Sequence, residues 1–291
     1  MNAVVRNLRF DLDDQGIPQY WHGGRRSLSI FCDNLSVFFP AGERFFVKAV
    51  RAHQTFVKDE RLMQEVQAFC GQEGIHAREH EHYNERVRRF YPTEAMERRV
   101  QAILDGASQG TPEIAQLGIT CALEHFTALL GNILLRYPRL LEGAHPEMDA
   151  LWRWHAAEEN EHKAVAYDVF TAAGGDYGTR VYTMIGATAI FWAKVIEQQA
   201  RMMRASGILL SAREWSALLR YLFVEPGGML RLIRLYFEYY RPDFHPSHID
   251  SDEVLDRWHA AYDASPRYAQ AAAAGRTGRH SRPSGALAPA S

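Results

Sequence analysis

The sequence predicts an all-helical protein in which four helices form a bundle with a polar centre, followed by additional helices. Apolar residues recur with a period near 3.6 over long stretches, and no stretch alternates polar and apolar residues as a strand would. Four of these stretches also carry glutamate or histidine on the apolar face, where a bundle core is otherwise hydrophobic. With 291 residues, of which 47% are hydrophobic, the chain can bury a sizeable core.

Caps and breakers along the chain set the expected helix boundaries. Asp59 is a candidate N-cap, and Pro112 stands where a first-turn proline is favoured. Pro138 and the pair Gly174-Gly175 indicate helix ends. On these signals we expect helices over residues 27–38, 41–57, 59–90, 111–136, 146–173, 177–205, 211–223, 226–240 and 251–268.

These helices suggest one domain with a short segment on either side. Residues 1–26 form an N-terminal extension, and residues 27–268 form the helical domain. Within that domain we expect the bundle over about 41–173 and the additional helices over 177–268. Residues 269–291 are rich in Ala, Gly, Ser and Pro, so we expect a disordered tail there.

Composition excludes several classes of function. A net charge of -2 gives no general attraction to nucleic acid or to an anionic membrane. The N-terminus has acidic residues where a signal peptide would be apolar, which favours a cytoplasmic protein. The apolar run 181–193 is too short to span a bilayer, so we expect no transmembrane segment.

The stretch 59–90 carries the first part of a candidate metal site. Its inward stripe passes from apolar residues to Glu73, His76 and His80 and back to apolar residues. Residues three apart lie on neighbouring ridges of one helix face, so Glu73 and His76 can reach a single metal ion. Glu79 and the charged residues near it are expected on the solvated face instead.

Three further helices complete the pattern. Stretch 146–173 repeats the motif with Glu159 and His162, and His155 lies one turn earlier on the same stripe. The stretches 111–136 and 41–57 each place one glutamate, Glu124 and Glu43, on a core stripe. One Glu from each of two helices and an E-x-x-H motif from each of the other two is the ligand pattern of two-metal carboxylate bundles. Such ligands suit two iron ions, with manganese or zinc as alternatives.

Some assignments stay open at this point. Glu158 competes with Glu159 for the inward position, although the spacing favours Glu159. His80 could be a ligand, a partner of a ligand or a core histidine. His125 is about 100° from Glu124 around the helix and is expected to be a bystander or a partner of a ligand. His53 is expected to be structural.

The motifs resemble a known family. The segments PAGERFF (40–46), QEGIHAREHEHYN (72–84), ALEHFT (122–127) and LWRWHAAEENEHKAVAYDVF (151–170) are similar to the bacterial family called predicted metal-dependent hydrolase. The segment FHPSHID (244–250) also fits that family. The resemblance implies a ferritin-like four-helix bundle with a di-metal carboxylate centre.

A more distant resemblance concerns His155. The motif His155-x-x-x-Glu159-x-x-His162 is similar to that of the p-aminobenzoate N-oxygenase group of di-iron enzymes. That group has an extra histidine ligand one turn before its E-x-x-H motif. The resemblance thus implies seven ligands here: Glu43, Glu73, His76, Glu124, His155, Glu159 and His162.

These features lead to a main functional hypothesis and two alternatives. The first is a di-iron enzyme that activates O₂ to oxidise a small, apolar organic substrate, supplied with electrons by a ferredoxin or flavoprotein reductase. The second is a metal-dependent hydrolase that uses the same centre, and the third is a non-enzymatic ferritin-like metal-binding protein. No nucleic-acid partner is expected, and assembly as a homodimer is left open.

Overall fold

The computed structural model describes residues 4–13 and 15–277, and it contains no strand within those residues, only an isolated bridge between His22 and Ala144. The all-helical prediction is therefore confirmed. The α-helices are α1 (Arg26–Ser36), α2 (Phe39–His53), α3 (Glu60–Val87), α4 (Thr93–Gly110), α5 (Glu113–Arg136), α6 (Pro146–His162), α7 (Val165–Ala172), α8 (Tyr177–Ala205), α9 (Ala212–Phe223), α10 (Gly228–Glu238), α11 (Asp252–Ala264) and α12 (Pro266–Thr277). Short 3₁₀ turns occur at η1 (Gln54–Phe56), η2 (Pro138–Leu141) and η3 (Pro246–His248).

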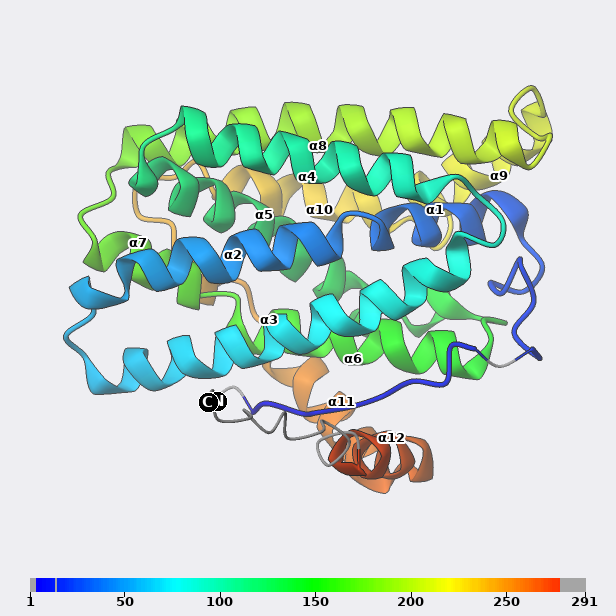
Figure 1. The fold of residues 1–291 in the computed structure, drawn as a ribbon, viewed down its shortest axis with the longest axis horizontal. Coiled ribbons are helices and arrows are strands. Elements are labelled where there is room, and N and C mark those ends of the chain that lie inside the picture. Colours follow the sequence, from blue (N-terminus) through cyan, green and yellow to red (C-terminus); the bar gives the residue numbers. More distant parts are fainter. Residues whose placement is uncertain (1–3, 14, 278–291) are drawn as a thin grey trace, which may run out of the picture.

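Helices α2, α3, α5 and α6 form the predicted bundle. Helix α2 packs on α3 and α5, and α6 packs on the same two neighbours, so the four helices close a ring. They run along the long axis of the molecule, and α8 runs along the same axis and contacts α5 and α1 (Figure 1). Helix α7 continues the bundle beyond α6 and contacts α2, α3 and α5. The site helices are thus packed against one another and against α7 and α8.

Local signals explain where the bundle helices begin. The Asp59 carboxylate accepts a hydrogen bond from the Arg61 backbone N–H and caps α3, as predicted. Helix α5 starts directly after Pro112, and α6 starts at Pro146, where a missing N–H costs nothing. The side chain of His145 caps α6 by accepting from the Glu147 N–H.

Several boundaries differ from the prediction. We did not predict α4, although Met96, Val100 and Leu104 recur every four residues and are all buried. The stretch 146–173 is not one helix, because the chain turns at residues 163–164, directly after His162. Residues 269–277 belong to α12 rather than to a disordered tail.

Helix α12 is ordered by contacts that its composition does not reveal. The Tyr268 hydroxyl donates a hydrogen bond to the Ala150 carbonyl, and its ring lies 5.8 Å from that of Trp258. The N-terminal segment adds a second anchor, because the Arg9 N–H donates to the Ala271 carbonyl. Residues 278–291 of the expected tail lie outside the described residues.

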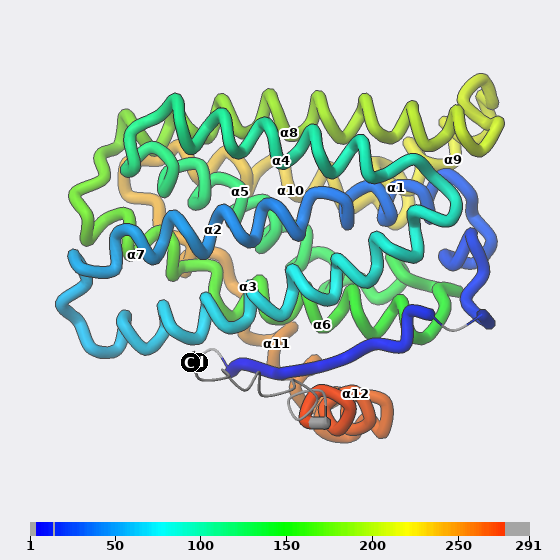
Figure 2. The backbone as a smooth tube through the Cα atoms, viewed as in Figure 1, coloured from blue at the N-terminus to red at the C-terminus, as the bar shows by residue number. Residues whose placement is uncertain are grey.

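The N-terminal segment runs as an extended strap along α3 and α6 and past α12 (Figure 2). Glu79 holds it there: its buried carboxylate accepts hydrogen bonds from the Phe10 N–H and from Arg78. The expectation that Glu79 is solvated was therefore wrong. A helix surface that looks solvated in the sequence can be covered by a segment distant in sequence.

The bundle centre lies between two apolar clusters. Phe69, in one cluster, packs edge-on against His162 with ring centroids 4.9 Å apart. Trp154, in the other, packs edge-on against His76 at the same centroid distance. Both aromatic residues are fully buried, so they exclude water from the histidines between them.

Helix α5 is long and apolar enough to cross a membrane, judged by length and composition alone. It packs against α2, α6, α7, α8 and α10, and 72% of its most apolar window is buried inside the protein. These contacts are typical of the central helix of a globular core.

Candidate metal centre

The four bundle helices bring all seven predicted ligands to one place. Helix α2 contributes Glu43, α3 contributes Glu73 and His76, α5 contributes Glu124, and α6 contributes the remaining three. Each of the seven side chains is buried: Glu43, Glu73, His76, Glu124, His155, Glu159 and His162. Burial of four carboxylates together is costly unless cations compensate their charge.

One group of donors surrounds His162. Its Nε2 atom lies 3.0 Å from Glu73 Oε1 and 3.5 Å from Glu124 Oε2. The same atom is 3.7 Å from Glu159 Oε1. One donor atom from each of these four residues lies within 4.8 Å of the others, a spread that a single metal ion can bridge.

A second group surrounds His76. Its Nδ1 atom lies 3.4 Å from Glu159 Oε1 and 3.8 Å from Glu73 Oε1. Donor atoms of Glu43, Glu73 and His76 lie within 4.8 Å of one another, as do those of His76, His155 and Glu159. Glu73 and Glu159 therefore belong to both groups, which places them where carboxylates could bridge two ions.

Buried polar atoms without hydrogen-bond partners test whether these residues fit a pair of metal ions. Both carboxylate oxygens of Glu43, Glu73 and Glu124 are buried and have no hydrogen-bond partner, and neither do His76 Nδ1 and His162 Nε2. Buried polar atoms almost always have a partner, so a group of unpaired ones indicates a binding site for an ion or water. Two divalent cations would supply the missing partners of all five residues, so the site fits a metal pair.

The pKa shifts show how strongly the carboxylates repel one another. Burial, followed by the neighbouring Glu73 carboxylate, raises the pKa of Glu43 well above its usual range. The same two causes raise the pKa of Glu124 to about 8. In contrast, although burial raises the pKa of Glu159, the three neighbouring histidines outweigh burial and hold it well below its usual range. Without metal the centre therefore holds extra protons, and metal binding would displace them.

Glu158 lies outside the centre and contacts a predicted ligand from behind. Its Oε2 atom is 3.0 Å from Nε2 of His76, whose other nitrogen faces Glu73 and Glu159. This position is typical of a carboxylate that orients a metal-binding histidine. The geometry thus places Glu159 inside the donor groups and Glu158 behind them, in agreement with the spacing.

A continuous series of hydrogen bonds runs behind the histidines. Arg6, from the N-terminal strap, donates to Glu158 at 3.0 Å and to both carboxylate oxygens of Glu161 at 2.7 and 2.8 Å. Glu161 accepts a further bond from Gln72 Nε2, and Gln72 Oε1 lies 3.0 Å from His162 Nδ1. His76 and His162 are therefore linked through Glu158, Arg6, Glu161 and Gln72.

Most residues of this hydrogen-bonded series were not predicted from the sequence. Gln72 and Glu161 directly precede Glu73 and His162, and that adjacency was the only signal for them. Arg6 could not be recognised from the sequence. It lies on the N-terminal strap, and its contacts form only because the strap packs against residues more than 60 positions away in the chain.

A second chain of hydrogen bonds fixes His155. The Ser36 hydroxyl donates to Asn84 Oδ1 at 2.7 Å, so it accepts from His80 Nδ1 at 2.8 Å. His80 Nε2 is then an acceptor, and His155 Nδ1, 2.6 Å away, is its donor.

The resulting tautomer favours a cation beside His155. Burial, followed by the positive charge of His76, lowers the pKa of His155 to about 4, which keeps the ring neutral. With its proton on Nδ1, Nε2 carries a lone pair that faces Glu159 Oε1 at 2.9 Å and Glu43 Oε1 at 3.8 Å. Two such acceptors in close contact need a cation between them. His80 is better described as the residue that orients His155 than as a ligand.

Two further histidines considered in the sequence, His53 and His125, lie outside the donor groups. His53 Nδ1 contacts the Ala49 carbonyl at 2.9 Å, near the end of α2. His125 packs between the rings of Tyr239 and Phe244, and burial lowers its pKa to about 3. These positions agree with the structural role expected for His53 and with the bystander role expected for His125.

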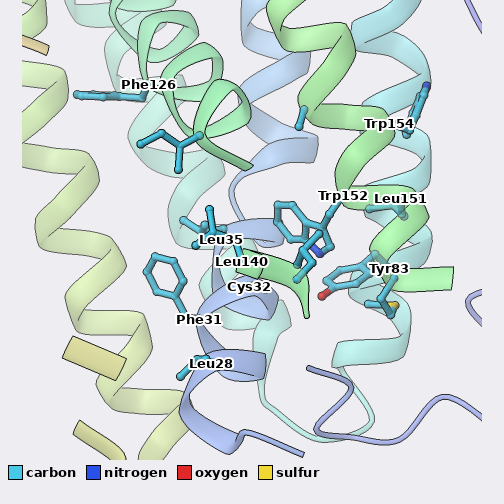
Figure 3. Close-up of a cluster of buried hydrophobic side chains, with 14 of the residues drawn as sticks. Leu28, Phe31, Cys32, Leu35, Tyr83, Phe126, Leu140, Leu151, Trp152 and Trp154 are labelled. Atoms are coloured by element: carbon cyan, nitrogen blue, oxygen red, sulfur yellow. The ribbon is translucent and has the colours of Figure 1, made fainter. Parts of the chain in front are cut away.

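An apolar cavity of about 110 Å³ reaches the centre at His155 and Glu159. Several of its walls are visible in Figure 3, where Phe31, Cys32 and Leu35 of α1 gather near Trp152 of α6. A larger cavity of about 360 Å³ lies between α2, α4, α5 and α8. The two cavities share four wall residues, Leu35, Phe39, Thr127 and Leu130.

Comparison with known proteins agrees with the first resemblance. The sequence profile of a family described as "predicted metal-dependent hydrolase" matches residues 4–250, which is most of the chain. No curated protein matches, and no solved structure does either. The chain belongs to the predicted metal-dependent hydrolase family.

Proposed function

We propose that this protein is a hydrolase that uses two divalent metal ions to cleave a small, largely apolar ester or related compound. The observation that carries this proposal is the pair of donor groups that share Glu73 and Glu159, in a chain of a family described as metal-dependent hydrolases. The predicted ligands are Glu43, Glu73, His76, Glu124, His155, Glu159 and His162.

A metal pair of this kind lowers the pKa of bound water and polarises the bond to be cleaved. The chain itself supplies position and exclusion of solvent. Glu158 and Gln72 hold the rings of His76 and His162, and the apolar cavity beside Glu159 binds the substrate. The apolar part of the substrate would extend into the larger cavity, whose volume lies in the usual range for ligand pockets.

The cavity walls offer no alternative nucleophile of obvious reactivity. Cys32 lines the smaller cavity, but burial raises the pKa of its thiol far above neutral pH. A protonated thiol is a poor nucleophile. This supports water as the nucleophile in a hydrolytic reaction.

Oxidation of an apolar substrate by O₂ at a di-iron centre is a second candidate. The observation that favours it is the His80–His155 pair, which would supply one more nitrogen donor than the six-ligand pattern. The apolar cavity would also protect reactive oxygen species from water. This reaction would need an electron donor such as a ferredoxin or a flavoprotein reductase.

Metal reconstitution separates the two candidates. Metal-free protein is loaded with Zn²⁺, Mn²⁺ or Fe²⁺ and assayed on a series of 4-nitrophenyl esters under argon and in air, with Glu73→Gln as the inactive control. Hydrolysis under argon with Zn²⁺ or Mn²⁺ supports the hydrolase. If no metal supports hydrolysis while the Fe²⁺ form consumes O₂ and changes its absorption spectrum, the hydrolase proposal is wrong and the oxidase is favoured.

A further inference from the structure

Large apolar side chains are exposed mainly in one part of the molecule. Of the fifteen strongly exposed large hydrophobic residues in the described part of the chain, twelve lie between residues 177 and 241. This segment contains α8, α9 and α10, and we call it the α8–α10 layer. Scattered exposed apolar residues are ordinary, but a concentration of them indicates a binding surface.

The exposed residues line up on helix faces. On α10, Leu230, Ile233 and Phe237 follow one stripe and are 55%, 49% and 62% exposed. On α8, the exposed Ile185 lies one turn before Thr188, whose hydroxyl is 2.9 Å from that of Tyr236 on α10. Exposed apolar residues thus flank the contact between α8 and α10.

The same layer carries positive charge. It contains nine Lys or Arg residues and four Asp or Glu residues, whereas the whole chain has a net charge of -2. Arg180 is buried among aromatic rings, so the accessible surplus is four positive charges. Several of the arginines pair with glutamates on the surface, as Arg234 does with Glu238. Such exposed pairs are weak and can exchange partners.

The layer also forms a wall of both cavities. Leu222 of α9 and Met229 of α10 are half-buried and line the smaller cavity, which reaches Glu159 at its other side. Each is adjacent in sequence to an exposed apolar residue, Phe223 and Leu230 respectively. The smaller cavity, whose walls include the predicted ligands His155 and Glu159, thus borders the exposed layer.

We propose that the α8–α10 layer binds the surface of an anionic membrane, and that the substrate is an acyl lipid that enters the cavity between α9 and α10. The substrate class rests on the proposed hydrolase function, but membrane binding does not. Exposed apolar residues with flanking arginines are the pattern of an interfacial surface, with the apolar face inserted and the arginines at lipid phosphates. Two copies of this face would bring like charges together, which disfavours a homodimer through it.

Vesicle sedimentation tests the proposal. The intact protein is mixed with vesicles of phosphatidylglycerol and phosphatidylcholine, or of phosphatidylcholine alone, at low and high salt. We expect binding to the anionic vesicles that weakens at high salt. Ile233→Ser combined with Phe237→Ser should reduce binding about tenfold or more, because the inserted apolar area is lost.

Matched variants separate this surface from general stickiness. Arg234→Glu and Arg61→Glu each reverse the charge of an exposed arginine that pairs with a glutamate four residues later. Only Arg234→Glu should weaken binding, by about tenfold. Similarly, Phe237→Ser should weaken binding, whereas Phe56→Ser in η1, outside the α8–α10 layer, should not; both phenylalanines are more than half exposed.

The outcomes distinguish this proposal from the function proposed above. Glu73→Gln should abolish metal binding and leave vesicle binding intact, so loss of hydrolase activity alone does not affect the membrane result. Equal binding by all surface variants, or no binding to anionic vesicles, would overturn the proposal. Dimers in light scattering that the Ile233→Ser/Phe237→Ser variant dissociates, without vesicle binding, would also overturn it and assign the layer to a second copy.

Discussion

The bundle and the α8–α10 layer distribute polarity in opposite ways. The bundle buries four carboxylates and three histidines at its centre, whereas the layer exposes most of the strongly exposed large apolar residues of the described chain. Each arrangement costs free energy in an isolated protein. The contrast fits the two proposals, in which the centre binds cations and the layer binds the surface of an anionic membrane.

The largest effect is expected from Glu73→Gln, at a residue shared by both donor groups. Metal content should fall from about two ions per chain to almost none. At the same time the metal-free protein should become more stable, because burial and the Glu159 carboxylate raise the pKa of Glu73 and the amide removes that repulsion.

Elemental analysis and thermal unfolding in EDTA measure the two quantities. The control is Glu81→Gln, which changes an exposed glutamate on the same helix. If Glu73→Gln retained both metals, the assignment of a shared ligand would fail. A variant that lost metal and also unfolded more easily would indicate a structural role instead.

Much of this centre could be predicted from the sequence, because the donors interrupt apolar stripes that bundle helices must bury. Glu43 and Glu124 were recognised in this way from single positions. The carboxylates and histidines keep fixed i, i+3 spacing, so helix geometry alone placed Glu73 beside His76. The ligand assignment itself stays a prediction until metal is measured.

Features that depend on distant segments could not be predicted. Arg6 acts through a strap that crosses α3 and α6, and α12 is ordered by Tyr268 and the same strap. The net charge of the chain likewise predicted no attraction to an anionic membrane. That net charge combines a positive α8–α10 layer with a negative remainder of the chain. By contrast, α4 had a visible stripe with Met96 and Leu104, and we overlooked it.

The metal-free centre should make stability depend on pH. Glu124 has a folded pKa of about 8, above its ordinary value of 4.5, so its protonated form is favoured in the folded protein. Its contribution to stability is full below about pH 4.5 and is lost as the pH rises through about 8.

Chemical denaturation in EDTA measures this effect between about pH 5 and about pH 9, a range that includes the folded pKa of Glu124. The free energy of unfolding should decline across the range, and Glu124→Gln should flatten the decline. With saturating metal the slope should reverse, because protons compete with metal for the ligands. The prediction fails if the metal-free protein gains stability towards pH 9.

Arg6→Ala should weaken metal binding without removing a ligand. Arg6 holds Glu158 and Glu161, which contact His76 and Gln72, and loss of such partners lowers metal affinity by roughly 10–100-fold. Competition with a chelator measures the affinity. Arg9→Ala, which changes an exposed arginine of the same strap, is the control.

A conservative variant separates position from charge. Arg6→Lys keeps the charge but cannot form the two-pronged contact with Glu161, so it should restore only part of the affinity. Full restoration by lysine would mean that charge alone matters. If Arg6→Ala left the metal affinity unchanged, the hydrogen bonds made by Arg6 would not orient the histidines.

Met229→Trp should affect catalysis selectively. The larger side chain narrows the cavity at α10, so the activity on long-chain esters should fall about tenfold relative to short-chain esters. Metal content should not change, because Met229 is not among the donors. An equal loss of activity on short and long esters would argue against a substrate path between α9 and α10.

The smallest effect is expected for the stability of Phe237→Ser. Phe237 is 62% exposed, so its replacement should change the free energy of unfolding by no more than about 0.5 kcal/mol. Leu232→Ala on the same helix removes a buried side chain and should cost about 2–5 kcal/mol. Urea denaturation of both variants makes the comparison. If Phe237→Ser were as destabilising as Leu232→Ala, the exposed stripe of α10 would belong to the folded core, and the difference between bundle and layer would disappear. If it is neutral, folding gives no reason for a large aromatic residue in solvent, and binding to a membrane does.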